Sequence, residues 1–208
     1  MRSHNLRAAA GSAGGGSGDI ALSHIGSPYI SVYQWSPSGF GSKYSNPSTL
    51  PAYNSFGPPD FSPDGSALAV PHAFSPHISV YPWSSSGFGT KYSNPSTAAG
   101  SNGYQAAFSP DGSYLAVAVQ NSPRVAVYSW SSSGFGTRYS NMVDADKPQG
   151  TAKSVAFTPD GANLAVGHDN SPYISVYPWD SGFGAKYSDP STLPTNSVRG
   201  IAFLFPDS

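Results

Sequence analysis

Nine residues, Ser171-Pro172-Tyr173-Ile174-Ser175-Val176-Tyr177-Pro178-Trp179, occur four times in this chain with small changes. The other copies are residues 27–35, 75–83 and 122–130, and each copy ends in one of the four tryptophans of the sequence. These tryptophans are 48, 47 and 49 residues apart. A nearly constant period of this length indicates a repeat architecture.

Composition narrows the class of protein. The chain has 208 residues, enough for one domain with a buried core, and only 10% are charged, with a net charge of −1. No basic patch that could neutralise phosphates is visible, so we expect no nucleic-acid partner. Cysteine and glutamate are absent, while 23 glycines and 20 prolines favour short strands over helices. No run approaches the roughly 18 apolar residues of a membrane span.

Each repeat carries the pattern of four short strands. An apolar run recurs at residues 19–24, 67–72, 114–119 and 163–168, which is typical of a strand buried on both faces. The nine-residue motif supplies the next strand, because β-branched and aromatic residues predominate in it. A Gly-Phe-Gly hairpin turn then leads into a strand that begins with a basic residue, and such a charge on an outer strand discourages edge-to-edge pairing. The basic residues are Lys43, Lys91, Arg138 and Lys186.

The unit ends in a strand that closes on phenylalanine and runs into a Pro-Asp-Gly turn at residues 63–65, 110–112 and 159–161. Four short strands in this period are typical of a β-propeller blade. The succession Phe-Ser-Pro-Asp-Gly-x-x-Leu-Ala-Val and Ile-Ser-Val-Tyr-x-Trp resembles WD40 repeats and the related YVTN/lactonase-like propeller repeats over about residues 19–208. The Gly-His and Trp-Asp dipeptides of true WD40 repeats match only at 167–168 and 179–180, so their hydrogen-bonded tetrad is not assumed.

We therefore predict an all-β propeller of four blades over residues 19–208, with repeats at about 19–61, 62–108, 109–157 and 158–208, after a flexible leader at residues 1–18. The chain enters at the second strand of a repeat and ends on the first. Residues 199–203 are accordingly expected to pair with the N-terminal strands and to close the ring, as in other propellers. The alternative is half of an eight-bladed ring formed by two chains.

A histidine ends the apolar strand in three of the four repeats, at His24, His72 and His168, with Val119 in the third. Three imidazoles around a central channel would suit a divalent metal, whereas the alternative is a hydrogen bond from each ring to the backbone of a neighbouring turn. The spacing equals the repeat period and no carboxylate recurs nearby. We therefore expect no metal site and no cofactor.

The residue after each Ser-Pro varies in character on an otherwise uniform scaffold. Variation in a loop on the expected binding face is what a recognition surface would show, and neutral variation is the alternative. Together with the three histidines, these residues are candidate ligand or partner contacts. The four are Tyr29, His77, Arg124 and Tyr173.

The phenylalanines of the Gly-Phe-Gly turns have two interpretations. They form an apolar ring on the opposite face, where a partner would bind, or they tuck under the adjacent blade. The tryptophans are expected to pack between blades, and the aspartates of the Pro-Asp-Gly turns to cap those turns, because one carboxylate per turn is too few for calcium. The phenylalanines are Phe40, Phe88, Phe135 and Phe183.

No combination of nucleophile, base and orienting residue stands out, so we expect no catalytic residue and no enzymatic activity. The leading hypothesis is a scaffold for assembly with a protein partner or with itself, or for surface attachment, in an extracellular or virion structural protein; repeats of this kind are, by resemblance, frequent in phage proteins. A ligand- or glycan-binding, lectin-like propeller is the first alternative. A lactonase-like hydrolase with a pocket at Asp169 and the histidines is the second.

Overall fold

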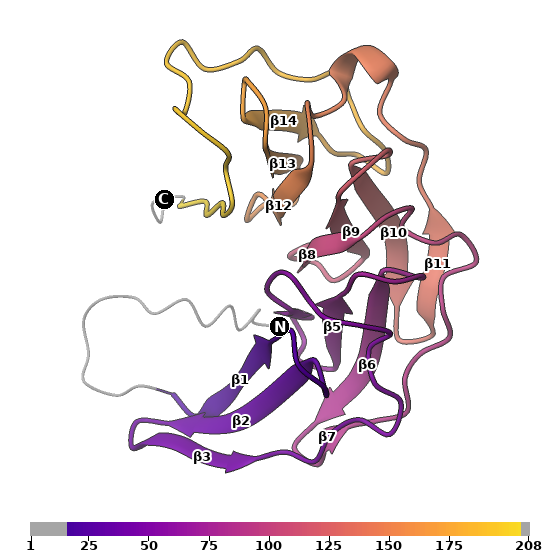
Figure 1. Cartoon of the computed structure of the whole chain (residues 1–208), viewed down its shortest axis with the longest axis vertical. Helices are drawn as coiled ribbons and strands as arrows, with labels where there is room; N and C mark the ends of the chain where they lie inside the picture. The colour runs from indigo at the N-terminus through magenta and orange to yellow at the C-terminus, as the bar shows by residue number, and fades with distance from the viewer. Residues whose placement is uncertain (1–15, 205–208) are drawn as a thin grey trace.

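The structure is a computed structural model that describes residues 16–204, in which four antiparallel β-sheets follow one another along the chain. Figure 1 shows the four sheets, or blades, arranged as an arc from the indigo first blade to the orange fourth blade. The only helix in the described range is the short 3₁₀ turn η1 (Asp144–Asp146). The prediction of an all-β fold without substantial helix is confirmed.

The strands occupy four positions in a blade, a to d, from the inner to the outer edge of the arc. In the described residues the first blade has no strand at position a and the fourth has none at position d. The first blade consists of β1 (Gly18–Ser23), β2 (Ile30–Ser36) and β3 (Gly39–Lys43), and the second of β4 (Asp60–Phe61), β5 (Ala67–Pro71), β6 (Ile78–Ser84) and β7 (Gly87–Phe88). The third consists of β8 (Gly103–Phe108), β9 (Tyr114–Val119), β10 (Val125–Ser131) and β11 (Gly134–Arg138), and the fourth of β12 (Ala152–Phe157), β13 (Asn163–His168) and β14 (Ile174–Pro178).

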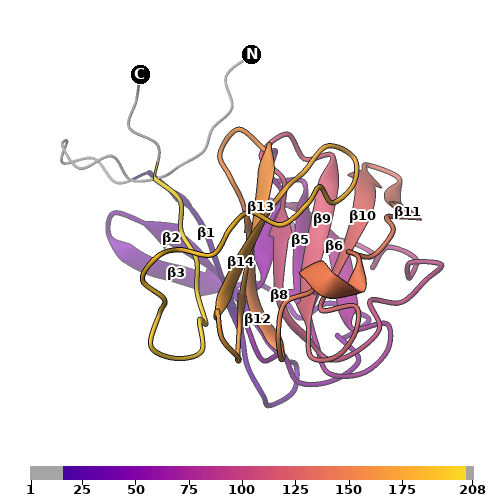
Figure 2. The ribbon, with the colours of Figure 1, turned by 90° about the horizontal axis from the view of Figure 1, so that it is seen from above.

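Backbone hydrogen bonds hold the outer edge of every blade in the same register. The tyrosine after the basic residue donates its amide to a strand c carbonyl in each case: Tyr44 to Val32, Tyr92 to Val80, Tyr139 to Val127 and Tyr187 to Val176, all at 2.9 Å. The fourth blade keeps this bond even though the residues around Tyr187 are not a regular strand. In Figure 2 the strands of the middle blades stand upright side by side.

The core lies between consecutive blades. The rear face of a blade, which faces the next blade along the chain, carries small or β-branched side chains such as Ala67 and Val80. The front face, which faces the preceding blade, carries large ones such as Leu115, Tyr128 and Trp130. Small side chains opposite large ones allow two twisted sheets to interlock at the density of a protein interior.

The Pro-Asp-Gly turns cap themselves as predicted. The Ser62 hydroxyl donates to Asp64 Oδ1 at 2.6 Å, the Ser66 amide donates to the same oxygen at 3.0 Å, and Gly65 has φ +71°. The second and third copies repeat these bonds at Asp111 and Asp160. These carboxylates are therefore occupied by turn formation.

The predicted closure of the ring by the chain itself is not shown. Among the described residues β1 pairs with β2 alone, and residues 201–204 lie outside any strand. In Figure 1 the first and fourth blades lie at the two ends of the arc, on either side of its open side. The predicted leader lies outside the described residues up to residue 15, and β1 already begins at Gly18.

Candidate interaction surfaces

Each seam between blades is built around one buried tryptophan. Trp83, Trp130 and Trp179 are between 5% and 9% exposed. A tyrosine of the preceding blade meets each indole edge-on, with ring centroids 4.9 Å apart for Tyr44–Trp83, 5.1 Å for Tyr92–Trp130 and 5.3 Å for Tyr139–Trp179. Edge-to-face pairs are favourable because the positive ring edge meets the negative ring face. The motif tryptophan is thus the central residue of each contact between neighbouring blades.

The glycines of the hairpin turn make room for this tyrosine. A Cβ on Gly87 would come within 3.1 Å of the Tyr44 ring, and one on Gly134 within 3.1 Å of the Tyr92 ring. Both glycines also have positive φ, at +91° and +99°. Conformation and close packing together therefore require glycine at this position.

Polar contacts also cross the seams. The Asp19 carboxylate accepts a hydrogen bond from the Tyr44 hydroxyl and another from Trp83 Nε1, both at 2.9 Å. Burial raises the pKa of Tyr44, and the bond to Asp19 raises it further. A second tyrosine lies two residues before the tryptophan on strand c. The Tyr81 hydroxyl donates to the Thr49 carbonyl at 2.9 Å and the Tyr128 hydroxyl donates to the Thr97 carbonyl at 2.8 Å.

The two ends of the arc leave half a seam uncovered at each side. On the front end face, defined by Leu22, Tyr33 and Trp35, Trp35 is 41% exposed and Leu22 is 44% exposed. On the rear end face, defined by Asn163, Val176 and Tyr187, Tyr187 is 52% exposed. The Tyr187 hydroxyl donates to Asn163 Oδ1 at 3.1 Å. These two faces correspond to the front and rear blade faces that pack against each other, and are buried, at every internal seam.

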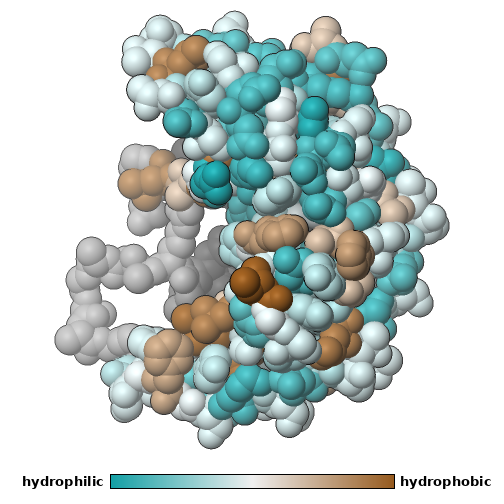
Figure 3. Space-filling view, in the orientation of Figure 1, coloured by the Kyte–Doolittle hydropathy of each residue, from teal (hydrophilic) through white to brown (hydrophobic). Residues whose placement is uncertain are grey.

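Exposed aromatic side chains gather over the first two blades. Tyr53 stacks on Phe74 with centroids 4.5 Å apart, and Tyr29 approaches Tyr53 at 5.9 Å. Phe56, in the same connector as Tyr53, is also exposed. Figure 3 shows hydrophobic residues mainly over the part of the face that belongs to the first two blades. We call Tyr29, Tyr53 and Phe74 the aromatic cluster.

A cleft of about 510 Å³ lies between the third and fourth blades. Its walls include Tyr139, Met142 and Phe183, with Asp146 at the polar side. The fourth hairpin is one residue shorter than the others, and a Cβ on Gly182 would meet nothing within 4 Å. The shorter turn therefore leaves open space beside Tyr139. At the other two seams, Gly87 and Gly134 occupy the corresponding space beside the tyrosine.

Each of the three candidate histidines lies in a different blade and links two neighbouring strands of that blade. The Nε2 atoms lie 3.1, 3.0 and 3.1 Å from the hydroxyls of Ser31, Ser79 and Ser175 in the neighbouring strand c. Two Nδ1 atoms also lie near backbone carbonyls, His24 at 2.6 Å from Gly26 and His168 at 2.9 Å from Gln149. Burial lowers the pKa of His72 to about 4. In the described residues no three metal-ligating side chains lie together.

The candidate recognition residues share one backbone conformation that the sequence did not reveal. Each follows a cis Ser-Pro bond, and the φ values of Tyr29, His77, Arg124 and Tyr173 lie between +70° and +74°. His77 Nδ1 lies 2.9 Å from the Ala73 carbonyl, and Arg124 donates to the Gln120 carbonyl. Two of the four side chains thus bond to their own turns, while Tyr29 belongs to the aromatic cluster. Their role in recognition stays a prediction.

The hairpin phenylalanines pack within their own blades. Phe88, Phe135 and Phe183 are half-buried and meet the indole of the same blade edge-on, at 5.0, 5.1 and 5.1 Å. Phe40 meets Trp35 at 5.3 Å and is exposed together with it. At the first blade, Phe40 therefore extends the front end face.

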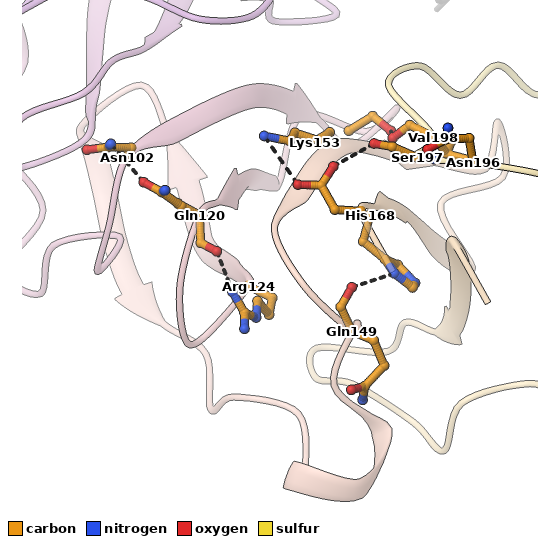
Figure 4. A network of polar contacts seen from close by, with 11 residues as sticks. Asn102, Gln120, Arg124, Gln149, Lys153, His168, Asn196, Ser197 and Val198 are labelled. Atoms are coloured by element: carbon orange, nitrogen blue, oxygen red, sulfur yellow. Dashed lines mark hydrogen bonds and ion pairs between the residues drawn. The ribbon is translucent and has the colours of Figure 1, made fainter. Parts of the chain in front are cut away.

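A polar network ties the last described segment to the inner edge of the fourth blade (Figure 4). The Ser197 hydroxyl donates to Asp169 Oδ1 at 2.6 Å, and Lys153 Nζ lies 3.5 Å from Asp169 Oδ2. Burial alone would raise the pKa of Asp169, but the Ser197 bond and the Lys153 charge bring it below the usual value. Asp169 is thus an anchor for Ser197 in this structure.

Among the described residues no helix has the length and hydrophobicity that a membrane crossing requires.

Similar solved structures share the fold. A protein from Lactobacillus plantarum is 21% identical, with a TM-score of 0.60 over 80% of this chain and 50% of its own. A candidate 6-phosphogluconolactonase from Bacteroides uniformis is 17% identical, with a TM-score of 0.53 over 73% of this chain and 44% of its own. The dihydro-heme d1 dehydrogenase NirN is 16% identical, with a TM-score of 0.52 over 78% of this chain and 32% of its own. The chain spans half or less of each.

These likenesses establish a β-propeller type of fold and nothing finer. The sequence matches no protein-family model and no curated protein. Membership of the WD40 or YVTN repeat families therefore stays a prediction from the motifs.

The expectation that the chain is not an enzyme is corrected by the same comparisons. NirN is an enzyme, and the Bacteroides protein carries an enzyme's name, so propellers of this shape support catalysis. The sequence has no evident combination of nucleophile, base and orienting residue, but this does not exclude a catalytic site. Functional sites are grafted onto folds, and such a site is assembled in space rather than along the chain.

Proposed function

We propose that this chain is a β-propeller assembly module that associates end to end with further copies of itself through its front and rear end faces. Trp35 carries the proposal. Its three counterparts are buried by a tyrosine from the preceding blade, whereas Trp35 is 41% exposed. Tyr187, the counterpart of those tyrosines, is 52% exposed at the other end of the arc.

The apolar parts of the two end faces are complementary because the internal seams consist of the same two halves. Tyr187 of one copy stands to Trp35 of the next as Tyr44 stands to Trp83. Gly39 has φ +106° and open space around its Cβ position, where Gly87 and Gly134 receive the tyrosine ring. Exposed indole and phenol rings on a soluble protein mark interaction sites, since burying them is strongly favourable.

The polar groups are complementary as well. Asn163 lies at the strand b position of Asp19 and already accepts a hydrogen bond from Tyr187, as Asp19 does from Tyr44. The second donor to Asp19 is Trp83 Nε1, and its counterpart is Trp35 Nε1. An amide oxygen has two lone pairs, so Asn163 can accept both bonds.

A second polar pair follows from the connectors. Thr49 and Thr97, which accept hydrogen bonds from Tyr81 and Tyr128, end the segments Asn-Pro-Ser-Thr. The fourth repeat has Asp-Pro-Ser-Thr at residues 189–192. The hydroxyl of Tyr33 on one copy therefore has the carbonyl of residue 192 on the next as its expected acceptor.

Sedimentation velocity over a range of concentrations tests the proposal. The wild-type chain is expected to associate, and Trp35→Ala and Tyr187→Ala are each expected to weaken association. Phe74→Ala removes an aromatic ring that is 57% exposed and lies outside the end faces, and it serves as the matched control. A chain that stays at the 21.6 kDa of one copy at every concentration, or association that both end-face variants leave unchanged, would contradict the proposal.

The aromatic cluster supports a second candidate function, the binding of a glycan. Stacked aromatic side chains with one open face offer an apolar platform, and this connector is aromatic in the first repeat only, with small and polar residues at 98–102 in the second. A glycan array probes it. Binding that Tyr53→Ala abolishes would support this function, and the absence of any hit from folded protein would exclude it.

A further inference from the structure

We infer that two copies of this chain close one eight-bladed ring, and that each copy lends residues 198–203 to the first blade of the other as its strand a. This inference rests on the proposed end-to-end association and adds the number of copies and the pairing of strands.

The curvature of the arc favours two copies. The end faces differ from each other, so each contact is heterologous, and heterologous contacts produce either a closed ring or an open filament. Figure 1 shows four blades that curve around one open side. The same arc matches half of the Lactobacillus plantarum chain and 55% of a protein from Desulfotomaculum acetoxidans, at TM-scores of 0.60 and 0.58. A second copy of equal curvature supplies the other half of a ring.

The last segment starts where a further blade would begin. The Val198 amide donates to the His168 carbonyl at 3.3 Å. The Gly103 amide donates to the His72 carbonyl at 3.0 Å in the same way, and Gly103 is the first residue of β8, the strand a of the next blade. Gly103 precedes Phe108 by as many residues as Val198 precedes Phe203. Residues 198–203 therefore enter position a of the blade that follows the fourth.

The first blade of another copy can receive this strand. Within the described residues β1 has one hydrogen-bonded neighbour, β2, and its inner edge is open. An open strand edge is a template for pairing with another chain. The front face of that same blade carries the exposed Trp35, so one docking event covers both the edge and the face.

The internal blades fix the register of this pairing. Phe61 lies opposite Leu68, Phe108 opposite Leu115 and Phe157 opposite Leu164. Ile20 holds the place of these leucines in β1, so Phe203 belongs opposite Ile20 and Ile201 opposite Leu22. The apolar alternation of the segment agrees with this register, and a slip by one residue would turn Ile201 and Phe203 to the opposite face.

Engineered disulfides test the register directly, because the chain has no cysteine of its own. The Phe108 amide donates to the Asp60 carboxylate instead of to β9, which makes Phe108–Leu115 and Ala106–Val117 non-hydrogen-bonded pairs. Such pairs have Cα atoms about 4.5 Å apart, within reach of a disulfide. The corresponding pair is Ile201 and Leu22, so the variants are Leu22→Cys and Ile201→Cys. Ala21→Cys with Ile201→Cys is the control, since Ala21 faces the other side of β1.

The expected result is a disulfide-linked heterodimer when chains with Leu22→Cys and chains with Ile201→Cys are mixed and oxidised. A chain that carries both cysteines is expected to run at twice the mass of one chain without reductant. The control pair is expected to give no such product. Ile20→Cys with Phe203→Cys repeats the test one pair along the strand, and circular dichroism verifies that each variant is folded.

Four outcomes would overturn the inference. A double-cysteine chain that links to itself at the mass of one copy would show that the ring closes within the chain. Folded variants that associate in sedimentation but form no link with either pair would remove the exchanged strand and leave end-to-end association standing. Equal linking by the control pair would remove the register. Failure of the wild-type chain to associate at all would overturn the proposed function as well.

Discussion

Replacing Trp130 by alanine is expected to destabilise the chain far more than replacing Trp35, although both occupy the same place in the repeat. Trp130 is 9% exposed and meets Tyr92 of the second blade, Phe108 and Phe135 edge-on. Truncating a buried aromatic side chain of this size costs about 3–5 kcal/mol. Trp35 keeps about two fifths of its surface in water and loses mainly its contact with Phe40, so about 2 kcal/mol is expected.

Urea unfolding followed by circular dichroism measures both free energies, at a concentration low enough to keep the chains apart. The difference of about 1–3 kcal/mol between the two variants is the share that Tyr92 of the preceding blade and Phe108 of strand a contribute together. A double-mutant cycle of Trp130→Ala with Tyr92→Leu isolates the edge-to-face pair, for which about 0.5–1.5 kcal/mol is expected. Equal losses for Trp130→Ala and Trp35→Ala would refute the view that the seam is built on this ring pair.

Three further outcomes follow from the structure. Burial raises the pKa of Asp60 to about 6, so stability should fall by at most about 3 kcal/mol as the pH rises from about 4 to 6, and Asp60→Asn should abolish that fall in urea titrations across this range. Gly134→Ala should cost more in thermal unfolding than Gly39→Ala, because both have positive φ but the first also meets a tyrosine ring at 3.1 Å; equal costs would contradict the packing argument. The ionised form of Asp169 holds the last segment, so Asp169→Asn, or acidification to below the ordinary carboxyl pKa of about 3.9, should lower the protection of the Val198 amide against hydrogen exchange, measured relative to the intrinsic rate at the same pH; unchanged protection would show that this anchor is dispensable.

The repeat and its strands could be predicted from the sequence because each signal is local. The apolar runs, the Pro-Asp-Gly turns and the motif strand recur at a fixed period, and the structure places strands at β5, β9 and β13 where the runs lie. The pairing of tyrosine with the next tryptophan was not predicted, because the two residues lie in different repeats and touch only after the blades stack. The short spacing from the basic residue to that tyrosine was nevertheless visible in all four copies.

Closure and the candidate site were harder to predict for a related reason. Residues 199–203 have the sequence of a strand a, and the pattern cannot tell whether they pair with their own first blade or with that of another chain. The histidines recur with the repeat, but their spacing could not reveal that each Nε2 binds a serine of its own blade. The positive φ of Tyr29 and its counterparts is unusual for residues other than glycine, and the residue types at these positions do not indicate it.

The mass of the folded chain under native conditions tests the central claim most directly. Native mass spectrometry at micromolar concentration is expected to give one species at twice the 21.6 kDa of a single chain, and Trp35→Ala is expected to shift it towards a single copy. A wild-type species that remains at the mass of one chain would contradict the account, as would a ladder of ever larger species without a closed pair.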